Sequence, residues 1–188
     1  MNVIDAIRTR RSVRAYSSKP ISAGTIYRLA EAMRSAPSAC NYQPWHFVWV
    51  QNAELRKGVA KAANDKLWLA EAPIIVVACG MPEKAYPKMG GYSNSVDIDL
   101  AIAMDHLILA ATTEGLGTCW IGAFNEATVK QLLGIPAGVK IVAMTPLGYP
   151  ASPDLLRPIR EDERLPLSKI ISTDRYAGPP LGVSYPDD

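Results

Sequence analysis

The chain is organised around ten residues, Ala36–Trp45, which read Ala-Pro-Ser-Ala-Cys-Asn-Tyr-Gln-Pro-Trp. The two prolines fix φ at their own positions, and they disfavour helical backbone at the preceding residues, Ala36 and Gln43. Short polar side chains fill most other positions, so the stretch predicts a stiff, irregular loop that projects amide and hydroxyl groups. Such a loop suits the binding of a flat heterocycle, because little backbone is left to order when the ligand arrives. An ordinary surface connection explains the same stretch equally well.

Regular structure is predicted on both sides of this loop. Before it, Ser22 is an N-cap, and Ile26, Leu29, Ala30 and Met33 recur at helical spacing. Further helices are predicted at Val3–Thr9, Ala53–Ala63 with a short continuation to Ala70, Val96–Glu114, and from Asn125 to Gly134. Strands are predicted at Phe47–Val50, Pro73–Cys79, Thr118–Phe124 and Lys140–Tyr149.

Two of these segments say more about their place in the fold. Pro73–Cys79 is continuously apolar and rich in β-branched residues, which predicts a strand buried on both faces. Pro146 predicts that the last strand is an edge strand or ends near this residue. From Pro146 onward prolines become frequent, which favours an extended arm draped over another surface.

The longest helix candidate, Val96–Glu114, is apolar around most of its circumference. A helix of this kind must be covered on all sides. In a chain of 188 residues the cover can come from a second copy, so we expect a homodimer with this helix at its centre. Burial inside a monomer is the alternative.

Composition limits the class of protein. The chain is 48% hydrophobic and 20% charged, as is typical of one globular domain, which we expect to span residues 1–188. A net charge of +2 is too small to favour nucleic acid or an anionic membrane as the partner. The sequence has neither a long apolar run nor a secretory pattern at its start. Three cysteines, Cys40, Cys79 and Cys119, are an odd number without CxxC spacing, so we expect a cytoplasmic protein. Two histidines do not suggest a metal site.

A basic segment, residues 10–14, reads Arg-Arg-Ser-Val-Arg. If it is extended, alternation puts Arg10, Ser12 and Arg14 on one side. Two guanidinium groups beside a hydroxyl make a good phosphate site, because arginine keeps its charge and offers a planar set of donors. A solvated basic turn or a small nucleic-acid patch is the alternative.

Residues 80–95 lack periodicity and are rich in glycine and proline, with Tyr86, Met89 and Tyr92 interspersed. A segment of this length without regular structure is typically a functional loop or a lid. A disordered surface insertion is the alternative.

Six motifs, in this order along nearly the whole chain, resemble those of the nitroreductase family of FMN-dependent oxidoreductases. They are Arg10–Arg14, Ala36–Trp45, Glu71-Ala72-Pro73, Gly115–Phe124 (Gly-Leu-Gly-Thr-Cys-Trp-Ile-Gly-Ala-Phe), Leu147–Pro150 and Arg164–Leu167. The resemblance implies an α+β fold, with a mixed, mainly antiparallel central sheet flanked by helices and an extended C-terminal arm. It also implies an intertwined homodimer with FMN bound at the interface.

The resemblance also implies roles for individual residues. Arg10, Ser12 and Arg14, joined by Arg164, would contact the phosphate and ribityl chain of FMN. The loop residues Pro37, Ser38 and Asn41 would contact the flavin of the partner subunit, with Gln43 supporting the loop. The backbone at Ile121 and Gly122 would approach the flavin near N5, where a glycine permits close contact.

The sequence departs from the family pattern near its end and in one helix. Asp162 stands where some members have a lysine. Either Arg160 takes the place of that lysine, or the chain binds the phosphate more weakly. Lys66 lies near the position of a lysine that some members place at the flavin, in a loose alignment.

The chemistry implied is a ping-pong transfer of hydride from NADPH or NADH, through flavin N5, to a nitroaromatic, quinone or enone. This scheme needs no catalytic side chain and no metal. The alternatives within flavin proteins are reductive dehalogenation, fragmentation of the flavin, and a non-catalytic flavin-binding or storage role.

Overall fold

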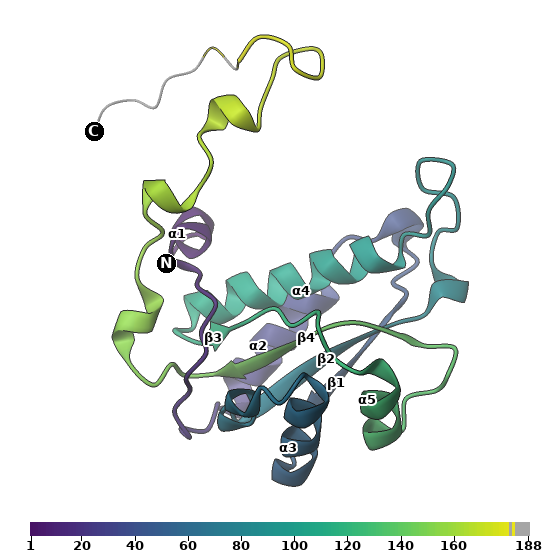
Figure 1. Ribbon diagram of the computed structural model, residues 1–188, viewed down its shortest axis with the longest axis vertical. Helices are drawn as coiled ribbons and strands as arrows, with labels where there is room; N and C mark the ends of the chain where they lie inside the picture. The colour runs from purple at the N-terminus through teal and green to yellow at the C-terminus, as the bar shows by residue number, and fades with distance from the viewer. Residues whose placement is uncertain (181, 183–188) are drawn as a thin grey trace. The chain divides into compact units, whose positions relative to one another are not determined.

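The computed structural model describes residues 1–180 and 182 of the chain. The chain divides into two units, residues 1–157 and residues 158–188. The first unit is an α+β domain built on one sheet (Figure 1). The expectation of a single domain over residues 1–188 stays a prediction.

The sheet has four strands in the order β1-β2-β4-β3. The strands are β1 (Trp45–Val50), β2 (Ile74–Gly80), β3 (Gly117–Thr118) and β4 (Lys140–Gly148). All neighbouring strands are antiparallel, and a parallel component enters through an isolated bridge between Ser12 and Thr118. The predicted mixed, mainly antiparallel sheet is therefore confirmed.

Strand β2 lies at the centre of two hydrophobic cores, and all of its residues are buried. Ile75, Val77 and Cys79 face the core formed with α3 (Ala53–Ala62) and α5 (Glu126–Leu133). The alternate residues of β2 face the second core, formed with α2 (Ala23–Arg34) and α4 (Val96–Thr113). Figure 1 shows these two helix pairs on opposite sides of the sheet. The continuous apolar run of the sequence is thus explained by burial on both faces.

Helix boundaries follow the capping residues of the sequence. A short helix, α1 (Val3–Thr9), begins after Asn2, whose side chain accepts the backbone N–H of Asp5. Ser22 and Asn125 cap α2 and α5 in the same way. Helix α5 ends at Gly134, whose φ of +65° is a left-handed conformation that glycine adopts readily.

The structure corrects the first of three sequence expectations and bears out the other two, the short helix after α3 and a strand end near Pro146. The predicted strand Thr118–Phe124 is limited to β3, because the Cys119 N–H donates to the Thr145 hydroxyl and leaves the regular ladder. The continuation after α3 is a 3₁₀ helix, Leu67–Glu71. Strand β4 lies between β2 and β3, so Pro146 marks the end of a strand and not an edge strand.

Helix α4 is largely buried, as its composition predicts, yet part of its surface stays uncovered. Ile98 is 47% exposed on this helix, and α1 exposes the apolar side chains of Val3, Ile4 and Ile7. No helix among residues 1–180 is both long and apolar enough to cross a membrane.

Residues 80–95 form a hydrogen-bonded loop. A 3₁₀ turn, Pro82–Lys84, begins it, and Met89 and Ser93 bridge across it. The Asn94 side chain donates to the carbonyl of Pro82 at 2.9 Å. This internal bonding favours the loop or lid interpretation over a disordered insertion.

The second unit, described through residue 180 and at residue 182, contains 3₁₀ turns at Glu161–Glu163 and Leu167–Lys169. Between its ends the Thr173 N–H donates to the Pro179 carbonyl at 2.8 Å. This part of the unit contains no strand and no α-helix, in agreement with an arm.

Candidate functional site

The 10–14 segment lies against β3 in extended form. The Val13 N–H donates to the Thr118 carbonyl at 2.9 Å, and the Val13 side chain is buried. A Cβ added at Gly117 would lie 2.7 Å from a Val13 methyl, so only glycine allows this close packing. With Val13 directed inward, backbone alternation directs Arg10, Ser12 and Arg14 away from the core, as predicted.

Tyr16 fixes the end of this segment. Its hydroxyl donates to the Val13 carbonyl at 2.7 Å, and its N–H donates to the Glu71 carboxylate at 3.1 Å. Burial raises the pKa of Tyr16 far above its ordinary value, so the phenol remains a protonated donor. The backbone path of residues 10–14 is therefore held by hydrogen bonds at both Val13 and Tyr16.

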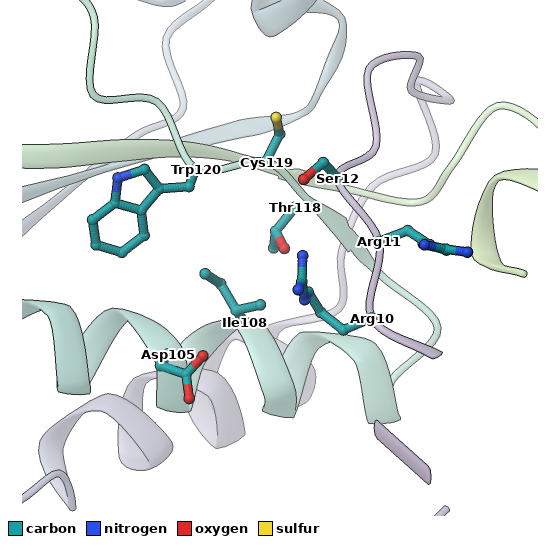
Figure 2. Close-up of a pocket in the computed structure, with 8 residues that line it drawn as sticks. All are labelled: Arg10, Arg11, Ser12, Asp105, Ile108, Thr118, Cys119 and Trp120. Atoms are coloured by element: carbon teal, nitrogen blue, oxygen red, sulfur yellow. The ribbon is translucent and has the colours of Figure 1, made fainter. Parts of the chain in front are cut away.

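A half-open cavity of about 200 Å³ lies between the 10–14 segment, β3 and α4. Figure 2 shows the Arg10 side chain directed into the space between β3 and α4, and the Arg11 side chain directed away from it. The Arg11 Nε donates to the Arg157 carbonyl. The lining residues are Arg10, Arg11, Ser12, Asp105, Ile108, Thr118, Cys119 and Trp120. Of the predicted phosphate ligands, Arg10 and Ser12 line the cavity and Arg14 does not.

The electrostatics of the cavity suit an anion. Arg10 and Arg14 form no ion pair with a carboxylate in the part of the chain that the structure describes, although the Asp105 carboxylate lines the same cavity. Burial raises the pKa of the Cys119 thiol, while the nearby Arg14 and Ser12 side chains act in the opposite direction. The Arg10 guanidinium beside the Ser12 hydroxyl is a donor set that fits a phosphate monoester.

The 36–45 loop has a strained backbone. Cys40, Asn41 and Gln43 have φ values of +52°, +55° and +50°, a region that few residues other than glycine adopt. The Gln43 N–H donates to the Ser38 hydroxyl at 2.9 Å, and the Gln43 side chain donates to the Asn41 amide oxygen at 3.1 Å. The loop is therefore irregular and internally braced, and Gln43 departs from right-handed helical backbone as expected before proline.

The remaining predicted site residues lie apart from the cavity lining. Pro37 and Asn41 are exposed, Ser38 is half-buried, and none of the three lines the cavity. Ile121 is buried, and its backbone pairs with Met144. Gly122 is exposed, and a Cβ there would meet the Trp120 indole nitrogen at 3.7 Å.

Three charged residues near the ends of the predicted motifs are engaged locally. In the second unit, Arg164 donates to the Glu163 carbonyl at 2.7 Å, and Arg160 pairs with Asp162 at 3.0 Å. Lys66 donates to the Ala63 carbonyl at 2.9 Å. Their contacts with a cofactor stay predictions.

Several lining residues were not predicted from sequence. Ile108 carries no signal beyond its place in an apolar helix. Thr118, Cys119 and Trp120 lie in the Gly115–Phe124 motif, of which only Ile121 and Gly122 were predicted as site residues. Asp105 is an exposed acid on a helix that also carries Asp97 and Asp99, so no sequence signal distinguishes it.

Comparison with known proteins gives the family of the chain. The model of the nitroreductase family matches residues 7–82 and 66–149. A protein of Archaeoglobus fulgidus, provisionally assigned as an NADH dehydrogenase/NAD(P)H nitroreductase, is 35% identical over 149 residues, which cover 77% of this chain and 83% of the relative. The FMN reductase [NAD(P)H] of Bacillus subtilis is 27% identical over 189 residues, which cover 93% of this chain and 74% of the relative.

A solved structure supports the same assignment. The crystal structure of a nitroreductase family protein from Clostridium difficile superposes with a TM-score of 0.83 at 27% identity, covering 94% of this chain and all of that one. The α+β architecture is therefore shared along the length of both proteins. The chain belongs to the nitroreductase family of oxidoreductases.

Proposed function

We propose that this chain is an FMN-dependent oxidoreductase that takes hydride from NADPH or NADH and delivers it to a nitroaromatic, quinone or enone by a ping-pong mechanism. The cavity at Arg10 and Ser12 carries the proposal, because it combines an anion-binding donor set with an open side. The names of two relatives, an NAD(P)H nitroreductase and an FMN reductase [NAD(P)H], support this choice of cofactor and reductant.

The residues present fit FMN. Arg10 and Ser12 would hold its phosphate, with Arg14 adding positive charge. The role expected of Arg164 stays a prediction. Gly122 would allow the backbone to approach the flavin ring, since among the described residues only the Trp120 indole lies within 4 Å of its missing Cβ. Bound FMN supplies the two-electron chemistry, because flavin N5 accepts and releases hydride.

The site requires a second subunit in this proposal. A cavity of about 200 Å³ is smaller than the roughly 300–1,000 Å³ of typical small-molecule sites. In a homodimer the partner's copy of the 36–45 loop would complete it, with Pro37, Ser38 and Asn41 at the flavin. The apolar side chains exposed on α1 and Ile98 on α4 offer surface for such an interface.

The protein's own part is binding and electrostatics, and no side chain is assigned as an acid or base. Arg10 contributes a guanidinium group to the cavity lining. The raised pKa of Cys119 keeps this thiol neutral beside the cavity. Fixed positive charge and backbone donors around the cofactor favour its anionic reduced form.

The 80–95 loop is the proposed cover for the electron acceptor. It carries Tyr92, which is 90% exposed, together with the half-buried Tyr86 and Met89. Aromatic and thioether side chains contact many flat molecules without strict hydrogen-bonding demands. We therefore expect a broad range of acceptors.

An absorbance scan of the purified protein, before and after anaerobic NADPH or NADH, tests the proposal. We expect a flavin band that bleaches with at least one nicotinamide and returns with a nitroaromatic or a quinone. A band that neither nicotinamide bleaches would indicate a storage role, and loss of the band with fragments of the ring would indicate flavin breakdown. A colourless protein that takes up no added FMN would overturn the cofactor assignment.

Sedimentation velocity of the FMN-loaded protein tests the interface separately. A dimer at micromolar concentration is expected. A monomer that retains FMN would contradict the shared site.

A further inference from the structure

We infer that Asp99 is a positioning residue that holds the 36–45 loop and the 80–95 loop in one geometry. The inference rests on the proposed function, because these loops are the segments proposed to contact the flavin and the electron acceptor. It begins from the burial of a carboxylate: Asp99 is 2% exposed within the apolar helix α4.

Both carboxylate oxygens of Asp99 have a partner outside the helix backbone. Oδ1 accepts the N–H of Ala39 at 2.9 Å, inside the 36–45 loop. Oδ2 accepts the hydroxyl of Ser95 at 2.7 Å, where the 80–95 loop meets α4. A buried side chain of one helix thus binds two loops that are far apart in the sequence.

The link continues into the 80–95 loop through Ser95, which is 1% exposed. The Ser95 hydroxyl oxygen accepts the N–H of Tyr86 at 3.1 Å, and the Ser95 N–H donates to the Tyr86 carbonyl at 2.9 Å. The hydrogen bonds therefore run from Tyr86 through Ser95 to Asp99 and on to Ala39.

Burial of this carboxylate is costly for stability alone. Fully buried acids are almost always paired with a cation, and Asp99 has no ion pair in the part of the chain that the structure describes. Its charge is compensated by N–H and O–H donors and by its place in the first turns of α4, where the helix dipole favours an anion. An apolar side chain would fill this position in the core without the cost of removing a carboxylate from water. We therefore assign the carboxylate the role of binding the two loops.

The loop bound by Asp99 needs such an anchor. Its three residues with positive φ persist only if the surrounding structure fixes them. The bond to Ala39 lies directly before Cys40 and Asn41, where this strained backbone begins. A carboxyl group has two oxygens, so one side chain accepts from Ala39 and from Ser95 at the same time, which explains why an acid occupies this position.

The test compares Asp99→Ala, Asp99→Asn and Ser95→Ala with the matched control Asp97→Asn, on the same helix. Asp97 is an exposed acid that pairs with Lys140, so its change alters the charge equally without touching either loop. Hydrogen–deuterium exchange of FMN-free protein is followed in peptides covering residues 36–45, 80–95 and 74–80. FMN affinity and the acceptor KM are then measured on loaded protein.

Asp99→Ala is expected to accelerate exchange about tenfold or more in both loops and to weaken FMN binding by a similar factor, with exchange in β2 unchanged. Ser95→Ala is expected to accelerate hydrogen–deuterium exchange in the 80–95 loop and to raise the KM for the electron acceptor. The FMN affinity of this variant should stay near wild type. Asp99→Asn is expected to be intermediate, because its amide oxygen still accepts from Ala39.

A purely structural role would accelerate exchange in β2 together with the loops. That result, or exchange in Asp99→Ala equal to that of Asp97→Asn, would overturn the inference. If Asp99→Ala does not fold, Asp99→Asn and Ser95→Ala decide the question by the same readouts. A wild-type protein without affinity for FMN would refute the proposed function, whereas the exchange results would still test the role of Asp99.

Discussion

The 10–14 segment and the 36–45 loop carry the two halves of the proposed FMN site, and different forces hold them. The first is extended and is fixed by backbone bonding to β3 and by the buried Val13 side chain. The second has three residues with positive φ and is fixed by side chains, notably Ser38, Gln43 and Asp99. Regular backbone periodicity positions charge in the first, while particular side chains maintain an otherwise unfavourable backbone in the second.

The largest effect is expected from the double change Arg10→Ala and Arg14→Ala. It removes two of the three guanidinium groups of the 10–14 segment, and it leaves Arg11 and the Val13 backbone bond intact. Because each charge-assisted bond contributes about 1.5–3 kcal/mol, FMN affinity should fall by more than about 100-fold. Equilibrium dialysis or fluorescence titration with FMN measures the change.

The control for this change is Arg28→Ala with Arg34→Ala, which removes the same charge from α2. It should leave FMN affinity near wild type. Retention of yellow colour by the Arg10/Arg14 variant, or an equal loss in the control, would contradict a local phosphate site.

A second prediction attacks the packing of the 10–14 segment. In Gly117→Ala the new methyl would lie 2.7 Å from the Val13 side chain, so the variant should lose about 1–3 kcal/mol of unfolding free energy. Urea denaturation measures the loss. Gly138→Ala is the matched control, because no atom of residues 1–180 or 182 lies within 4 Å of a Cβ there.

The double variant Val13→Ala with Gly117→Ala sharpens this test. Its destabilisation should be smaller than the sum of the two single losses, since the smaller side chain makes room for the methyl. Strict additivity would show that the Val13 side chain does not restrict the size of the residue at position 117.

Loss of one hydrogen bond within the 36–45 loop should have a smaller effect than the changes in the 10–14 segment. Ser38→Ala removes the acceptor for the Gln43 N–H but leaves the bond from Ala39 to Asp99. We expect a loss of about 1 kcal/mol in stability and a severalfold loss in FMN affinity, by titration and urea unfolding. Ser18→Ala, at an exposed position of the same chain, should change neither quantity.

The difference between the two regions also explains what the sequence could predict. Periodicity and capping residues gave the helices and the buried strand β2, because those signals act within a few neighbouring residues. The same local reasoning placed Arg10 and Ser12 on one side of an extended segment, and both line the cavity.

The rest depends on contacts between distant residues. Strand β3 is short because of the hydroxyl of Thr145, on another strand, and the 36–45 loop is anchored by Asp99, on α4. Neither contact has a signature in the local sequence. The contribution of a partner subunit also cannot be seen in one chain, so the roles of Pro37, Ser38 and Asn41 stay predictions.

The smallest effect is expected from a substitution that lowers the backbone strain of the 36–45 loop and keeps all of its hydrogen bonds. Cys40 is exposed and has a φ of +52°, and asparagine adopts this region more readily than cysteine. Cys40→Asn should therefore raise stability by about 0.5 kcal/mol and leave FMN affinity unchanged, because the hydrogen bonds of Ser38 and Ala39 persist. Thermal unfolding and FMN titration measure both quantities. A loss of stability would show that the thiol itself helps to fix the loop. Cys40 would then join Ser38, Gln43 and Asp99 as a side chain that stabilises this backbone.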